Sequence, residues 1–142
     1  MATNTANSTP IFINKGNFTP ARIAAANTAS DGSGTLVTLV TATTDGTRVD
    51  GVRFINSQAT AAASGLKILR IFLTDTGGAN PRLIGEVSMA AATRSTTVIG
   101  ATSIYTFDQA IIMQSGQLMS VCMSVYAGAQ DQTDAIAYAG NY

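Results

Sequence analysis

Apolar and polar residues alternate most regularly towards the C-terminal end of the chain, over Gln117–Tyr126 (QLMSVCMSVY). The apolar side chains that fall on one face of this segment are Met119, Val121, Met123 and Val125. A period of two residues over these ten positions predicts a β-strand with one buried face. Leu66–Thr74 (LKILRIFLT) has apolar residues on both faces, which predicts a strand deep inside a sandwich.

Further short runs rich in Thr, Val, Leu and Ile recur along the chain. Those that we interpret as strand material are Ile11–Ile13, Thr35–Thr43, Thr47–Asn56, Arg82–Ser88, Ser95–Ile104, Tyr105–Phe107 and Thr133–Tyr142, the last as a strand or an extended tail. Ala21–Ala26 fits a short strand or one helical turn, and Ala110–Met113 is a short apolar piece. Gly51, in the middle of its strand, predicts a bulge or a close backbone approach.

Glycine-containing segments mark the connections between these runs. Asn14–Asn17, Asp31–Gly34 and Asp75–Pro81 are predicted to be turns or loops. The pair Asp45-Gly46 lies between the runs 35–43 and 47–56, and an Asp-Gly pair in such a place favours a β-hairpin.

These elements predict an all-β protein, because helical periodicity is almost absent. We expect a jelly-roll-like β-sandwich of seven to nine short antiparallel strands. Residues 1–10 are polar and predict a flexible N-terminal arm. Residues 11–142 are predicted to form a single β-sandwich domain, which suits a chain of 142 residues.

Charge is scarce and balanced in this sequence. Charged residues make up 11% of the chain, and its eight basic and eight acidic residues give a net charge of zero. The basic residues are scattered, whereas a protein that neutralises phosphates needs a basic excess or stripe, so we do not expect nucleic-acid binding. No apolar run approaches the length of a membrane span, and Met1–Thr5 has no features of a signal peptide. We therefore expect a protein that is made in the cytosol and does not enter a membrane.

The residues for common enzyme chemistry are missing. Histidine is absent, so the usual general base and the commonest metal ligand are lacking. Cys122 is the only cysteine, which rules out an internal disulfide. It lies in mid-strand with no cationic neighbour in sequence, and we interpret it as a buried or half-buried packing residue.

The eight carboxylates do not form a recognisable catalytic pair. Asp31, Asp45 and Asp75 each begin a glycine-containing turn, where such a side chain commonly caps backbone N–H groups. The loops 75–80 and 131–134 offer oxygens to a cation, but neither has the spacing of a known calcium loop. We therefore predict no catalytic, cofactor-binding or metal site, no cofactor, and a protein that is not an enzyme.

Aromatic residues give a weak indication of a binding surface. Tryptophan is absent, and most of the aromatic residues occupy core or strand positions. Tyr138 and Tyr142, near the C-terminus, are the exceptions. They either meet a neighbouring subunit or a ligand, or pack onto the domain's own sheet.

Four segments, taken in order, resemble a known family. They are Asp31–Thr35 (DGSGT), Gly46–Asp50 (GTRVD), Ile71–Asp75 (IFLTD) and Pro81–Val87 (PRLIGEV). This succession resembles the small β-sandwich structural proteins of tailed-phage and prophage particles, over roughly residues 28–140. The motifs are strand-and-turn patterns without catalytic residues. We interpret their polar members as structural groups beside the sandwich, namely Arg48, Asp50, Arg82 and Glu86.

The resemblance implies a virion structural protein made in the host cytoplasm. It would be an auxiliary (decoration or cement) capsid protein that stabilises the assembled head, or a related head or tail component. Its partners would be the major capsid protein or other virion proteins, and further copies of itself, with a trimer as the expected homo-oligomer. A carbohydrate-binding or adhesive β-sandwich in a head-fibre, tail or receptor-binding position is the alternative. The residues that we expect at contacts between subunits are Ile11, Phe12, Tyr138 and Tyr142.

Overall fold

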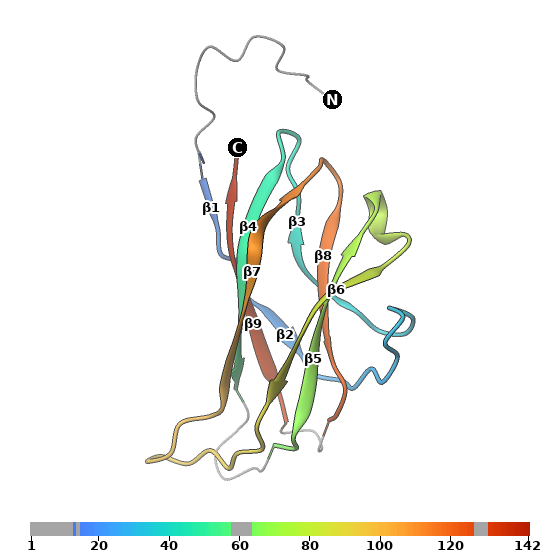
Figure 1. Ribbon diagram of the computed structural model, residues 1–142. Helices are drawn as coiled ribbons and strands as arrows, with labels where there is room; N and C mark the ends of the chain where they lie inside the picture. The colour runs from blue at the N-terminus through green and yellow to red at the C-terminus, as the bar shows by residue number, and fades with distance from the viewer. Residues whose placement is uncertain (1–12, 14, 58–63, 127–130) are drawn as a thin grey trace.

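The computed structural model describes residues 13, 15–57, 64–126 and 131–142. In these ranges the chain forms two antiparallel β-sheets that pack face to face around one apolar core (Figure 1). The predicted all-β class and β-sandwich are confirmed, while a jelly-roll-like topology stays a prediction. The expected N-terminal arm, residues 1–10, lies outside the described residues. No helix in the described part of the chain has the length and hydrophobicity to cross a bilayer.

Sheet 1 contains five strands among the described residues. They are β1 (Lys15–Asn17), β2 (Ala21–Ile23), β4 (Thr47–Asn56), β7 (Thr102–Met113) and β9 (Thr133–Asn141). The order is β1-β9-β4-β7, and β2 pairs with the other half of β9. Strands β1 and β2 therefore share one edge of the sheet, and β7 forms the opposite edge.

Sheet 2 contains four strands among the described residues. They are β3 (Val37–Thr41), β5 (Lys67–Thr74), β6 (Arg82–Met89) and β8 (Leu118–Met123). The order is β3-β8-β5-β6. The loop predicted at 75–81 contains a 3-10 turn, η1 (Thr76–Gly78), and β6 is the return strand of a β5–β6 hairpin.

Alternating side chains of both sheets fill the core between them. Its fully buried apolar members include Val52, Phe54, Leu69, Ile71, Met119, Val121 and Met123. Burying one such side chain stabilises the fold by about 1.5–3 kcal/mol. In β8 the face that the alternation predicted does point into the core, and Val125 lies beyond the end of the strand and is exposed.

The hairpin predicted around Asp45-Gly46 is wrong. The turn itself forms, with Gly46 at φ +100° and its N–H donating to the carbonyl of Thr43 at 3.1 Å. The flanking strands, however, belong to different sheets, since β3 pairs with β8 and β4 pairs with β7 and β9. Both strands bury an apolar face, and placing them on opposite sides of the core buries both faces at once.

Two other segments differ from the predicted pattern. Lys15–Asn17, predicted as part of a turn, is strand β1, because its backbone pairs with the distant residues 139–141 of β9. The pieces predicted at 105–107 and 110–113 are one continuous strand, β7. The irregularity predicted at Gly51 is confirmed, since the register of β4 shifts between Val49 and Gly51. A Cβ at Gly51 would lie 2.6 Å from the carbonyl oxygen of Tyr105.

Candidate functional site

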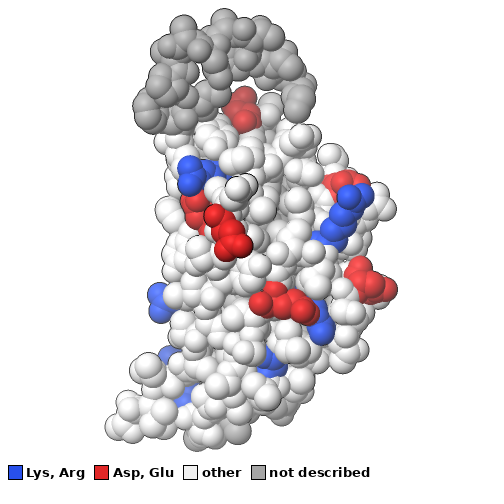
Figure 2. Space-filling model, viewed as in Figure 1, with Lys and Arg blue, Asp and Glu red and all other residues white. Residues whose placement is uncertain are grey.

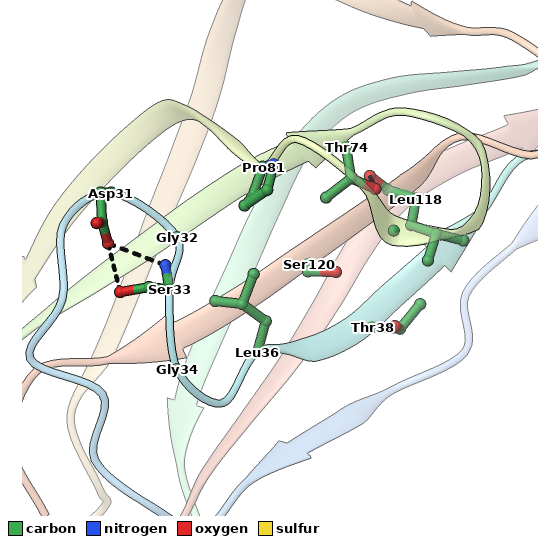
Figure 3. A pocket seen from close by; sticks show the side chains of 11 residues that line it. Asp31, Gly32, Ser33, Gly34, Leu36, Thr38, Thr74, Pro81, Leu118 and Ser120 are labelled. Atoms are coloured by element: carbon green, nitrogen blue, oxygen red, sulfur yellow. Dashed lines mark hydrogen bonds between the residues drawn. The ribbon is translucent and has the colours of Figure 1, made fainter.

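A groove of about 590 Å³ crosses the outer face of sheet 2 (Figure 3). Its floor is formed by hydroxyl side chains of three adjacent strands, Thr38 of β3, Ser120 of β8 and Thr74 of β5. The segment around Asp31–Gly34 forms one wall, and Pro81 lies beside it. The groove therefore combines hydroxyl groups from the sheet with backbone from a loop.

The segment 27–36 is held in shape by one buried side chain, Asn27. Its amide nitrogen donates to the carbonyls of Ser33 at 2.8 Å and Thr35 at 3.0 Å. Its amide oxygen accepts the N–H of Ala29 at 3.1 Å. Gly34, at φ +80°, lies so close to Asn27 that a Cβ there would be 2.9 Å from the amide oxygen. These contacts fix the loop without help from regular secondary structure.

The same loop covers the outer face of β5. The guanidinium of Arg70 donates to the backbone carbonyls of Asn27 and Thr28, at 3.4 Å each, and its Nε donates to Glu86 at 2.8 Å. Phe72, on the same outer face, is fully buried. Gly32 lies against Phe72, since a Cβ there would be 3.2 Å from the ring. This cover explains why Phe72 is buried on the outer face of β5, whereas Ile68 on the same face is exposed.

Asp31 is the carboxylate at the rim of the groove. It accepts hydrogen bonds from the hydroxyl of Ser33 at 2.7 Å and from the N–H of Ser33 at 2.9 Å. The hydroxyl bond, followed by the backbone bond, lowers the pKa of Asp31 below its ordinary value of 3.8. The turn-capping role predicted for this residue is therefore confirmed.

The groove can bind a ligand through hydrogen bonds but shows no catalytic arrangement. A single carboxylate and several hydroxyls line it, with no aromatic ring among the lining residues. Glycoside hydrolysis needs a second carboxyl group facing the first. Within the described ranges, no group of three His, Cys, Asp or Glu side chains is placed to hold a metal ion.

Cys122 lies on the outer face of sheet 2 and is buried, as the sequence predicted. Burial raises the pKa of its thiol above the ordinary value, and the nearby charge of Arg70 offsets part of that effect. Arg70 is its neighbour on β5, a cation that the linear sequence did not reveal. A thiol that is both buried and protonated is a poor nucleophile.

The structure places two of the four predicted contact residues. Tyr138 lies on the outer face of β9 with 40% of its surface exposed. Tyr142 is half-buried, and its N–H donates to the carbonyl of Gly46 at 3.3 Å. Ile11 and Phe12 lie outside the described residues.

Tyr138 belongs to an apolar outer face of sheet 1 that the sequence did not single out. In one row across the sheet, Ile104 of β7 and Ile136 of β9 flank Arg53 of β4. In the next row Tyr138 lies beside Gly51, which has no side chain. Ile104 is 54% exposed and Ile112, further along β7, is 57% exposed. We call Ile104, Ile112, Ile136 and Tyr138 the sheet 1 patch.

Two ion pairs lie beside the sheet 1 patch, while Arg53, between Ile104 and Ile136, has no ion pair among the described residues. Arg48 contacts Asp50 at 2.8 Å, and Arg22 contacts Asp134 at 2.9 Å. Burial acts to raise the pKa of Asp134, but hydrogen bonds, with that from Arg22 the largest, and the charge of Arg22 together hold the pKa below 3.8. Figure 2 shows the wider pattern on one side of the molecule, where charged groups are sparse among uncharged atoms.

A second exposed apolar site lies in the connection between β6 and β7. Ile99 is 87% exposed and Val98 is 51% exposed. Ser95 shapes this turn, since its hydroxyl accepts the N–H of Thr97 at 3.2 Å and of Val98 at 3.1 Å. Gly100 anchors the turn to β4, where a Cβ would lie 2.4 Å from the carbonyl oxygen of Asn56. This site was not predicted, because Val and Ile in the run 95–104 were interpreted as strand residues.

No protein-family model matches the chain, and no curated protein sequence matches it.

Proposed function

We propose that this chain is a virion structural protein of a tailed phage, an auxiliary capsid protein that binds the assembled head and stabilises it. The observation that carries the proposal is the sheet 1 patch, an exposed apolar surface on a protein of zero net charge. Apolar patches on a rigid sheet favour contact with another protein surface. The resemblance of four sequence segments to tailed-phage structural proteins supplies the partner.

The paired charges support the same proposal. A free charge that becomes buried at an interface costs several kcal/mol, whereas a charge that keeps its partner costs less. Arg48 and Asp50 keep one another, and so do Arg22 and Asp134. Contact over these two pairs would therefore remove apolar area from water, worth about 25 cal/mol per Å², without separating either pair.

Binding at several sites of a repeating shell strengthens the attachment that one weak contact provides. Each copy of the chain would bind a capsid lattice and its own neighbours, so several modest interfaces act together as one strong attachment. The expected homo-oligomer is a trimer, because a closed ring matches a symmetric lattice point. We place the protein in the virion, with the major capsid protein as its main partner and no catalytic role.

Co-sedimentation with purified heads that lack the chain tests this proposal. Tyr138→Glu and Ile104→Glu should reduce the bound fraction at least tenfold, because each puts a charge into the contact. Leu83→Glu is the matched control, since Leu83 on sheet 2 is 41% exposed and Tyr138 is 40% exposed. Equal binding of all variants, or no binding by the unmodified chain, would contradict the proposal.

The groove on sheet 2 favours a second candidate, a carbohydrate-binding or adhesive β-sandwich in a head fibre, tail or receptor-binding position. Thr38, Ser120 and Asp31 line the same groove, and sugars are bound through such hydroxyl and carboxylate groups. A glycan array tests this candidate. Binding that is lost in Ser120→Ala and Asp31→Ala, but kept in Tyr138→Glu, would favour the groove over the sheet 1 patch.

A further inference from the structure

Three polar side chains meet inside the sandwich at the junction of the two sheets. Lys67 begins β5 in sheet 2, Asn56 ends β4 in sheet 1, and Asp131 lies just before β9. Each of the three residues is only 1% exposed. Burying an amine and a carboxyl group is costly for a fold, so their presence here calls for a reason.

Lys67 and Asn56 contact the same oxygen atom of Asp131. The ammonium nitrogen of Lys67 forms an ion pair with Oδ1 of Asp131. The amide nitrogen of Asn56 donates to the same Oδ1 at 3.4 Å. One carboxyl group therefore contacts both an amine, which can act as a nucleophile, and a carboxamide, which can act as an acyl donor.

Buried side chains surround the Lys67 amine. Met123, whose sulfur lies 3.9 Å from the Lys67 nitrogen, is fully buried, and so is Thr133, whose hydroxyl lies 3.4 Å away. In the reaction proposed below, Lys67 first passes a proton to Asp131. The product is a neutral, nucleophilic amine beside a carboxylic acid.

We propose that Lys67 and Asn56 become joined by an isopeptide bond, with Asp131 as the proton carrier. The Lys67 nitrogen attacks Cγ of Asn56, so a C–N bond forms between the two side chains. Asp131 moves a proton from the attacking nitrogen to the departing amide nitrogen, and the original C–N bond of Asn56 breaks. Ammonia leaves and takes up the proton that Asp131 first received, so Asp131 ends as a carboxylate. The reaction is an acyl transfer and needs no oxidant or co-reactant.

Asn56, and not Asp131, is the acyl donor in this scheme. Asp131 contacts both other partners, so it is placed to carry a proton between them. The bond would tie the end of β4 to the start of β5, and so would link the two sheets covalently. This inference does not depend on the proposed function.

Mass spectrometry of the purified full chain tests the bond. The intact mass should be lower than the sequence mass by one ammonia molecule. Trypsin normally cuts after Arg53, Lys67 and Arg70, so Asn56 and Lys67 fall in one peptide. In the linked chain the Lys67 nitrogen is an amide and trypsin cannot cut there. A denatured digest should therefore contain the peptide 54–70, uncut at Lys67 and lacking one ammonia.

Two variants complete the test. Asn56→Ala and Asp131→Asn should both have their full sequence mass and be cut at Lys67, with circular dichroism to show that each retains its sheets. An unchanged mass of the unmodified chain would overturn the proposal. Loss of water with a link to Asp131 would overturn it by making Asp131 the acyl donor. Loss of ammonia with normal cleavage at Lys67 would point to a cyclised asparagine and would also overturn it.

Discussion

The aromatic ring of Tyr105, on β7, occupies the space that Gly85, on β6, leaves empty. A Cβ at Gly85 would lie 2.7 Å from two atoms of that ring. The Tyr105 hydroxyl donates to the carbonyl of Ile84 at 3.4 Å, and the Ser103 hydroxyl donates to the carbonyl of Ser88 at 2.8 Å. The ring and these two bonds close one edge of the sandwich, where the outer strands of the two sheets meet.

Gly85→Ala should therefore destabilise the protein by about 1–3 kcal/mol, because the added methyl group forces the ring or β6 to move. Urea denaturation followed by tyrosine fluorescence measures the change. Tyr105→Phe is the control, since it keeps the ring and removes only one long hydrogen bond, worth about 0.5–1.5 kcal/mol. A Gly85→Ala protein as stable as the unmodified chain would show that the edge is not tightly packed.

Arg70→Met should loosen the loop over sheet 2. The substitution keeps a long side chain above β8 but leaves the carbonyls of Asn27 and Thr28 without their donor. Leaving such groups unsatisfied costs about 1–3 kcal/mol. Hydrogen exchange should then become faster in residues 27–36. Arg82→Met, an exposed arginine on the neighbouring strand, should leave that exchange unchanged.

Asp31 makes stability depend on pH in a definite direction. Its pKa is lower in the folded chain than its ordinary value of 3.8, mainly through the hydroxyl of Ser33. The folded state therefore gains stability above pH 3.8, and the gain is lost as the pH falls through the lowered folded pKa.

Ser33→Ala should raise the pKa of Asp31 towards 3.8, because the hydroxyl bond disappears. Carboxyl-carbon NMR titration measures this directly. The pKa of Asp134 should not move in the same variant, since it depends on burial and on Arg22. An unchanged Asp31 pKa would mean that Ser33 does not contact it in solution.

Cys122 should resist a thiol reagent while the protein is folded. Burial shields the sulfur and raises the pKa of the thiol, so little thiolate is present at neutral pH. A colorimetric thiol assay should show no reaction in native buffer and one equivalent in denaturant. Rapid reaction in native buffer would mean that the segment 27–36 opens readily.

The strands were predictable where apolar and polar residues alternate or turn residues mark the ends of a run. The alternation over Gln117–Tyr126 predicted β8 and its buried face, and the loop predicted at 75–81 does separate the paired strands β5 and β6. The partners of β3 and β4 were not predictable, because a turn sequence specifies a local bend and not which sheet each strand joins. Pairing of Lys15–Asn17 with the end of β9 was hidden for the same reason.

The candidate sites were less predictable than the fold. The exposed position of Ile104 depends on β7 being an edge strand, which no local pattern reveals. Arg70 and Phe72 are buried on an outer face only because a distant loop covers them. Lys67 in the sequence LKILR resembles a solvent-facing lysine, and its contact with Asp131 arises only when the two sheets come together.

Electron cryomicroscopy of heads incubated with the purified chain tests the central claim most directly. We predict a two-layered density at repeated positions on the head, with the outer face of sheet 1 and Tyr138 turned towards the shell or towards a neighbouring copy. Heads without added density, or density in which the outer face of sheet 1 is turned to solvent, would contradict the account.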